Sequence, residues 1–192
     1  MATIKLLLGI VCFAFAGSFH DLHRNLLANS AIQNRIANPA NINYRSLLVN
    51  TAKNEIGIRE ETGTNDGPRI KTYLASVNIK NREPWCAAFI CWIYKQHGFL
   101  KPRSAWSPDL FPNAKLTKTG LPGDIYGIYF SSKKRIAHVG MVELVKGDWC
   151  VGIEGNTNLS GAREGDGVYR KRRNVKTIYR CADWVTQKGG AP

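Results

Sequence analysis

The sequence is poor in several residues and patterns that define common protein classes. Its five cysteines never form a C-x-x-C pair, the spacing that structural zinc sites commonly use, so such a site is not expected. Acidic residues are scarce: 14 Asp and Glu stand against 27 Lys and Arg, a formal net charge of +13. The chain has no internal repeat. What is present, 192 residues of which 44% are hydrophobic, is typical of one globular domain.

Long hydrophobic runs are absent apart from one near the start of the chain. Lys5 precedes the apolar residues 6–15, and Ala14-Phe15-Ala16 is a small-x-small cleavage site. This layout predicts a secretory signal peptide over residues 1–16, because the run is too short to span a bilayer. An uncleaved anchor is the alternative. We therefore expect a protein that is secreted, periplasmic or in the cell envelope, with no integral membrane span after signal cleavage.

The charge excess indicates polyanionic partners. Removing residues 1–16 deletes one cation, Lys5, and no anion, so the charge falls from +13 to +12. Such a charge attracts polyanions, which outside a bacterium include anionic cell-wall polymers. Nucleic acid is not expected, because the export signal argues against it and no basic stripe is interleaved with aromatics. The densest basic run, residues 170–173, is interpreted as a solvated strand edge.

The pattern along the chain predicts helices first and strands second. Residues 17–42 are polar and are expected to form a linker or lead-in. A helix is predicted over residues 44–56, a second after Asp66-Gly67-Pro68 with Asp66 as a possible cap, and a third after Cys86. Strands are predicted over residues 124–130, 136–145, 149–153, 167–172 and 175–181. This order predicts an α+β domain over residues 43–185, with helices packed on an antiparallel sheet, followed by a flexible tail at 186–192.

One cysteine stands at the start of a strongly apolar run. Residues 87–94 are too continuously apolar for a surface element and predict a buried helix ending near Gly98. Cys86 then lies in the first turn, where unpaired N–H groups favour the thiolate. It is therefore a candidate nucleophile, although a helix cysteine is more often just buried. Cys91 faces another side of the helix and is interpreted as a small buried hydrophobe.

Two downstream segments supply partners for this cysteine. Of the four histidines, two fall in the predicted linker and His97 lies at a helix end, which leaves His138 within an alternating apolar strand. Glu154 lies in another core strand, where an ionised carboxylate needs a partner that His138 supplies. Asn156 is the alternative orienting group for the imidazole. Nucleophile, base and orienting group are the parts that nucleophilic catalysis requires.

Three short blocks carry a family resemblance. Pro84-Trp85-Cys86-Ala87-Ala88-Phe89, Ala137-His138-Val139-Gly140 and Ile153-Glu154-Gly155-Asn156 resemble the active-site blocks of CHAP domains. These are cysteine, histidine-dependent amidohydrolase/peptidase domains of bacterial and phage cell-wall hydrolases. Leu121-Pro122-Gly123-Asp124-Ile125 resembles the turn that enters the family's first strand. The resemblance runs from about residue 46 to residue 181.

The resemblance implies a papain-like fold and a peptidoglycan hydrolase. It implies Cys86 as nucleophile, His138 as base, Glu154 as orienting residue and Asn156 as an accessory. The bond cut would be an amide, as in an N-acetylmuramoyl-L-alanine amidase or a stem or cross-bridge endopeptidase, through a thioester acyl-enzyme. Some CHAP enzymes bind calcium, but the chain has no Asp-rich loop of that kind, so we expect no metal and no cofactor.

Several questions stay open at this stage. A non-catalytic wall-binding module and an antibacterial effector with the same fold are the alternative functions, although a decayed site would lack one of the three groups. Cys150 and Cys181 lie on predicted strands and could form a disulfide. Trp85, Trp106 and Tyr129 could line a glycan groove, but we predict that each packs in the core.

Overall fold

The computed structural model describes residues 43–118, 120–160 and 165–186 of the chain. The predicted signal peptide, the predicted linker and the predicted tail beyond residue 186 lie outside these residues, so those predictions stay untested. Within the described ranges, no helix has the length and apolar character needed to cross a membrane.

The described chain begins with three helices, α2 (Tyr44–Asn54), α3 (Pro68–Ser76) and α4 (Cys86–Gln96). Pro68 is the first residue of α3, a position where the missing N–H has no helical acceptor in any case. Gly67, and not Asp66, is its N-cap. The predicted cap is wrong because the Asp66 carboxylate instead accepts hydrogen bonds from the N–H and hydroxyl of Thr62, which fold the preceding loop.

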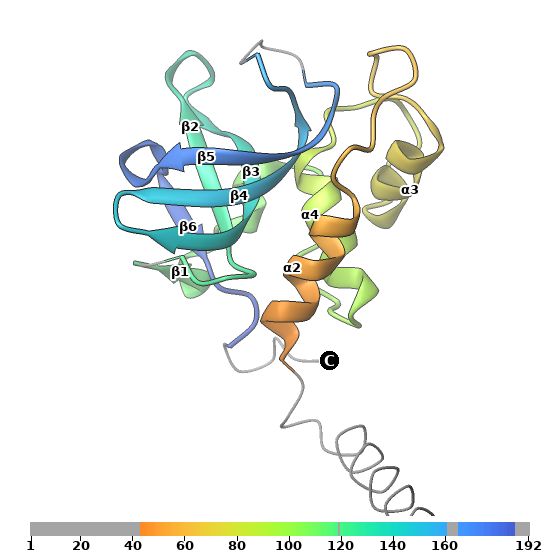
Figure 1. Cartoon of the computed structure of the whole chain (residues 1–192). Helices are drawn as coiled ribbons and strands as arrows, with labels where there is room; N and C mark the ends of the chain where they lie inside the picture. Colours follow the sequence, from red (N-terminus) through yellow and green to blue (C-terminus); the bar gives the residue numbers. More distant parts are fainter. Residues whose placement is uncertain (1–42, 119, 161–164, 187–192) are drawn as a thin grey trace, which may run out of the picture. The chain divides into compact units, whose positions relative to one another are not determined.

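A six-stranded sheet follows the helices, with strand order β1-β6-β2-β3-β4-β5 and every pair antiparallel. The strands are β1 (Leu116–Thr117), β2 (Ile125–Phe130), β3 (Arg135–Lys146), β4 (Trp149–Thr157), β5 (Gly167–Asn174) and β6 (Arg180–Ala182). Figure 1 shows the strands gathered on one side of this unit and α3 and α4 on the other. The predicted α+β class, with helices packed on an antiparallel sheet, is confirmed.

The last predicted strand, residues 175–181, is shorter than expected. Its first half is a turn of 3-10 helix, Val175–Thr177, and only Arg180–Ala182 joins the sheet. The side chain of Asn174 accepts a hydrogen bond from the Lys176 N–H and so starts the turn. The break is needed because β5 is at one edge of the sheet, whereas β6 pairs with β1 and β2 near the other edge.

The main core lies between α4 and one face of the sheet. Residues 86–94 of α4 are all buried, because this helix contacts α3 on one side and β3 and β4 on the other. Gly155 allows a close approach: a Cβ there would lie 2.6 Å from the Trp85 ring and 2.8 Å from Phe89. The missing side chain therefore lets the start of α4 lie directly against β4, next to Glu154.

Candidate active site

Cys86 is the first residue of α4, and its side chain is buried. The first N–H groups of a helix have no intrahelical acceptor, so they surround the sulfur with positive potential. A second polar group comes from the 3-10 turn Ser107–Leu110, where the Ser107 hydroxyl lies 3.6 Å from Cys86 Sγ. The sulfur is thus held between a helix start and a hydroxyl.

His138 reaches Cys86 from β3. Its Nε2 lies 2.8 Å from Glu154 Oε2, which leaves Nδ1 as the ring nitrogen available to the Cys86 sulfur, whose pKa the imidazole lowers. The register between β2 and β3 shifts beside this histidine, since Ile128 pairs with His138 but Tyr129 pairs with Ile136. Such bulges re-aim side chains next to functional sites, and this one accompanies the turn of the imidazole toward α4.

Glu154 is the most enclosed member of the site, with no exposed surface. Besides His138, its carboxylate accepts hydrogen bonds from Tyr126 Oη at 2.5 Å and from Arg173 Nε and Nη2 at 2.5 and 2.7 Å. Burial alone would raise the pKa of Glu154, but the hydrogen bonds and charges of Arg173 and His138 hold this pKa well below its usual range. The carboxylate is therefore ionised and fully paired.

The sulfur and the imidazole shift each other's protonation. Burial acts to raise the pKa of the Cys86 thiol, but the hydrogen bond and charge of His138, the Ser107 hydroxyl and the Val139 N–H lower it below its ordinary value. Burial also acts to lower the pKa of His138, whereas its hydrogen bonds to Cys86 and Glu154 raise it to about 9. Both shifts favour a thiolate beside an imidazolium at neutral pH.

Asn156, the other candidate for the orienting role, faces elsewhere. Its Nδ2 donates to Asn65 Oδ1 at 2.8 Å and to Glu60 Oε1 at 3.3 Å. Glu60 Oε1 also accepts from the Trp85 indole N–H at 2.8 Å. The structure therefore brings Cys86, His138 and Glu154 together, while Asn156 fastens the loop before α3 to the residue that precedes the nucleophile.

Sequence reasoning missed three members of this cluster: Ser107, Tyr126 and Arg173. Arg173 belongs to the basic run 170–173, whose interpretation as a solvated edge is wrong for this residue. A fully buried carboxylate needs more than one partner, and that requirement could have pointed to a cation besides His138. Gly140 makes room for the Tyr126 hydroxyl, which a Cβ there would approach to 2.4 Å.

The remaining cysteines lie outside the cluster. Cys91 is buried, its Sγ lies 3.4 Å from the backbone of Ser104, and burial raises its pKa to about 12. Cys150 and Cys181 are free, and β2 and β3 lie between their strands. Three strand spacings of ~4.8 Å exceed the ~7 Å that a disulfide can bridge between Cα atoms, so the possible bond is not formed.

Of the three aromatics considered for a glycan groove, only Trp85 is buried as predicted. Trp106 is 51% exposed and Tyr129 is 40% exposed, so the prediction of core packing is wrong for both. Each stands at the end of a short element and is covered only in part. Trp106 precedes the 3-10 turn at Ser107–Leu110 and has the Arg135 guanidinium over its ring, and Tyr129 is near the end of β2 and packs against Tyr179.

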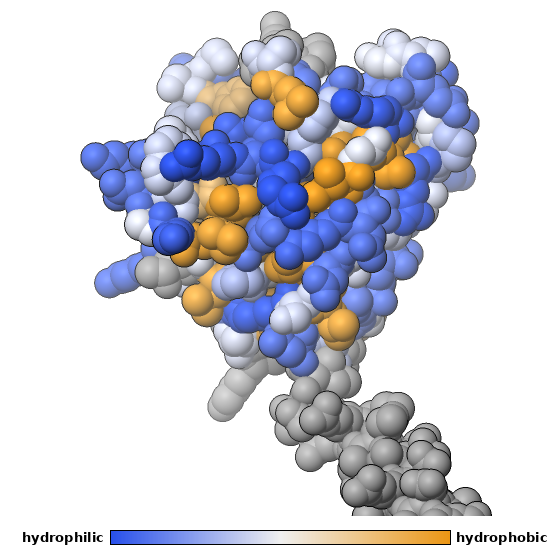
Figure 2. All heavy atoms as spheres, in the orientation of Figure 1, coloured by the Kyte–Doolittle hydropathy of each residue, from blue (hydrophilic) through white to orange (hydrophobic). Residues whose placement is uncertain are grey.

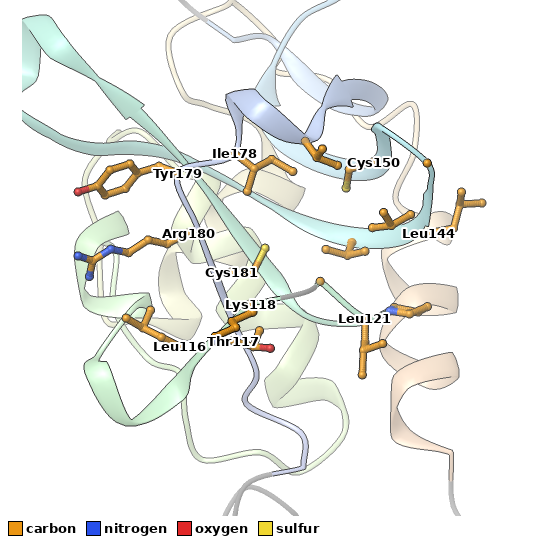
Figure 3. A pocket seen from close by; sticks show the side chains of 16 residues that line it. Leu116, Thr117, Lys118, Leu121, Leu144, Cys150, Ile178, Tyr179, Arg180 and Cys181 are labelled. Atoms are coloured by element: carbon orange, nitrogen blue, oxygen red, sulfur yellow. The ribbon is translucent and has the colours of Figure 1, made fainter.

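A cavity of about 840 Å³ has a different lining (Figure 3). Its lining includes Val142, Leu144, Cys150, Ile178 and Cys181, and none of the candidate catalytic residues. The cavity is therefore not the place where Cys86 meets a substrate. In the described part of the chain, no group of three or more His, Cys, Asp or Glu side chains is arranged to hold a metal ion.

Comparison with known proteins adds little to this geometry. No family model and no curated protein matches the chain. Among solved structures it is similar to one described as "The crystal structure of Ly7917", with 14% sequence identity and a TM-score of 0.44. The match covers 71% of this chain and 60% of that chain. This likeness is too weak to carry an argument about function.

Proposed function

We propose that this protein is a cysteine-dependent hydrolase that cleaves an amide bond of peptidoglycan through a thioester acyl-enzyme. The observation that carries the proposal is the contact chain from Cys86 through His138 to the buried, ionised Glu154. A nucleophile at a helix start, a base and an orienting carboxylate in that order support acyl transfer. Peptidoglycan as substrate is supported by the resemblance of the three sequence blocks to CHAP domains, by the predicted export and by the positive charge.

In the first half of the reaction, the Cys86 thiolate attacks the carbonyl carbon of the amide. The electron pair moves to the carbonyl oxygen, where the Cys86 N–H is one donor and the Ser107 hydroxyl, 3.6 Å from the sulfur, is a second. The intermediate then collapses: the carbon–nitrogen bond breaks, and His138 gives its Nδ1 proton to the leaving nitrogen. The products are a thioester on Cys86, a free amine and a neutral imidazole.

In the second half, water attacks the thioester. His138 takes a proton from that water as the oxygen–carbon bond forms, and the Cys86 thiolate leaves. The carboxylic acid product departs, and the thiolate–imidazolium pair is restored. Glu154 stays ionised throughout, because Arg173 and Tyr126 also donate hydrogen bonds to the carboxylate. Its role is to position the ring and stabilise the imidazolium.

The contact of all three groups favours an enzyme over a wall-binding module without activity. An antibacterial effector would use the same chemistry, so it differs from this proposal in its biological target and not in its site.

Mass analysis of purified peptidoglycan after incubation with the protein tests the proposal. Stem peptides with a new N-terminal alanine would identify an amidase, and new amino groups within the peptides would identify an endopeptidase. The Cys86→Ala variant is the matched control and should release neither. If the wild-type protein releases no fragment that this variant does not also release, the proposal is wrong.

A further inference from the structure

An exposed tryptophan stands beside the candidate nucleophile. Trp106 is 51% exposed and directly precedes Ser107, whose hydroxyl lies 3.6 Å from Cys86 Sγ. Consecutive Cα atoms are ~3.8 Å apart, so the Trp106 side chain leaves the backbone one residue before Ser107, the residue that contacts the reacting sulfur. Large exposed aromatics of this kind are enriched among residues that dominate binding.

A guanidinium covers one part of this indole. Arg135 Cζ lies 3.8 Å from the centroid of the Trp106 ring, and Arg135 begins β3, three residues before His138. One of its donors, Nη1, is engaged by the Ile136 carbonyl at 3.0 Å. A guanidinium stacked flat on a ring keeps its other N–H edges available in its own plane, the geometry that binds carboxylates.

The charge of Arg135 is not neutralised by a neighbouring acid. Within the described residues it forms no ion pair with a carboxylate. Six other arginines among the described residues each pair with one, whereas Arg103, Arg172 and Arg180 do not; the six are Arg45, Arg59, Arg69, Arg82, Arg170 and Arg173. A stacked cation without an acidic partner, on the strand that carries His138, is suited to an anionic group on a ligand.

The loop that carries Trp106 is also held in place before any ligand arrives. The Trp106 N–H donates to Ser104 Oγ at 3.0 Å, and that hydroxyl donates to Asp109 Oδ2 at 2.7 Å. The Ser104 N–H lies 3.4 Å from Cys91 Sγ inside the core. A loop tied to the core in this way loses little further freedom when it binds a ligand.

We propose that Trp106 and Arg135 form a substrate subsite that accepts a free carboxylate of a stem peptide close to the scissile amide. The inference rests on the proposed function. The indole packs against the aliphatic part of the peptide, and the guanidinium binds the carboxylate. Substrates in which that carboxylate is amidated lose the charged contact.

The chain supplies a matched control elsewhere on its surface. Arg172 Cζ lies 4.0 Å from the ring centroid of Trp149, which is 39% exposed. Trp149 begins β4, five residues before Glu154, a separation of about 16 Å at ~3.3 Å per strand residue. This second stack has the same chemistry but lies away from the Cys86–His138 pair.

The test uses two synthetic muropeptides that differ only in a carboxylate or a carboxamide beside the scissile bond. Wild-type kcat/KM should be about tenfold higher for the carboxylate, the scale of one charge-assisted hydrogen bond. Arg135→Gln should remove this preference, and Trp106→Ala should raise KM for both substrates. Arg172→Gln and Trp149→Ala should leave both constants near the wild-type values. Equal cleavage of both substrates by the wild-type protein, or equal effects of Arg135→Gln and Arg172→Gln, overturns the subsite.

Calorimetric titration of the Cys86→Ala variant with the same two muropeptides separates this inference from the proposed function. If the wild-type protein cleaves neither compound, the hydrolase proposal fails. Tighter binding of the carboxylate form, lost in Cys86→Ala/Arg135→Gln, then still supports the subsite. Equal binding of the two forms, or no binding of either, contradicts it.

Discussion

The protonation of Cys86 depends on groups that the chain brings together from three separate segments. His138 and Ser107 lower the pKa of the thiol against the effect of burial, and Glu154 keeps the imidazole in the orientation that does so. Glu154 acts through His138, so substitutions of these two residues should not have independent effects. The residue scale is therefore where the mechanism can be tested most directly.

Substitution of the nucleophile should separate activity from stability. Cys86→Ala removes the sulfur that forms the thioester, so peptidoglycan hydrolysis should fall below detection. The thermal midpoint should change little, because alanine fills most of the space in the first turn of α4. Cys91→Ala, in the same helix but without contact to His138, should keep its activity. Hydrolysis that survives in the Cys86 variant is incompatible with the mechanism.

The dependence of kcat/KM on pH should be bell-shaped. The active pair needs Cys86 ionised and His138 protonated. The value of kcat/KM should therefore rise as the thiol loses its proton, at a pH below the ordinary pKa of a thiol. It should fall as the imidazolium loses its proton near pH 9, because the pKa of His138 is raised to about 9. Ser107→Ala removes a hydrogen bond to the sulfur and should move the acid limb up by less than ~1 pH unit. An unmoved acid limb in this variant would contradict the role of Ser107.

The third member of the site can be identified by comparing two residues of one strand. Glu154→Ala leaves the imidazole without its partner, so the turnover rate should fall by a factor on the order of 10,000. Glu154→Gln should be less damaged, because an amide oxygen still accepts from the ring. Asn156→Ala should retain most of the rate, since Asn156 contacts Asn65 and Glu60. A His138→Ala/Glu154→Ala double variant should be little worse than His138→Ala. If the two losses multiply, or Asn156→Ala is the more damaging change, Glu154 is not the orienting residue.

At the scale of elements, strand β5 completes the site without contributing a reacting group. It pairs with β4, which places Arg173 opposite Cys150. The Arg173 side chain reaches along the sheet to Glu154. The start of α4 is likewise set by packing, since Gly155 lets Trp85 and Phe89 lie against β4. The register of these pairs positions the nucleophile, base and carboxylate relative to one another.

Two arginines of β5 test this dependence. Arg173→Met leaves a buried carboxylate without its bidentate partner, which should cost about 3–5 kcal/mol of unfolding free energy and most of the activity. Arg170→Met removes the more exposed pair with Glu143 and should cost no more than ~1 kcal/mol, with activity retained. Urea unfolding and turnover on the same preparations measure both quantities. Similar losses in the two variants would show that Arg173 is only a surface charge.

At the scale of the whole molecule, the dominant property is its charge. The chain has 27 basic and 14 acidic residues, and hydrophilic side chains cover most of the face in Figure 2, with apolar patches between them. A field of one sign raises the local concentration of polyanions and speeds their association. This property acts over the surface and does not depend on the geometry at Cys86.

Binding to purified cell walls should therefore weaken as salt rises. Exposed charges are screened over ~10 Å at 0.1 M ionic strength and over ~3 Å at 1 M. Pelleting of the Cys86→Ala variant with insoluble peptidoglycan that retains its anionic polymers, at both salt concentrations, measures the effect without digestion of the wall. Walls stripped of these polymers are the matched control and should show a smaller salt effect. Equal pelleting at low and high salt would show that specific contacts, and not charge, dominate.

Much of the fold was predictable because it follows from local patterns. The continuous apolar run after Cys86 predicted a buried helix, and residues 86–94 are indeed buried. The alternation around His138 predicted a strand. The elimination of other histidines, and the need of Glu154 for a partner, predicted the contact between His138 and Glu154 that the structure contains. Residue type and period are properties of short segments, so one sequence is enough to identify them.

Only the tertiary structure decided which side chains complete the site. Nothing in the basic run 170–173 distinguishes Arg173, half-buried against Glu154, from Arg170, which pairs with Glu143 nearer the surface. The choice between Glu154 and Asn156 depends on which side of β4 each faces after a bulge in the β4–β5 pairing. Trp106 remained half exposed because only part of its ring is covered, by the Arg135 guanidinium of β3. Each outcome depends on strand register and on contacts between residues far apart in the chain, which residue types and local periods do not specify.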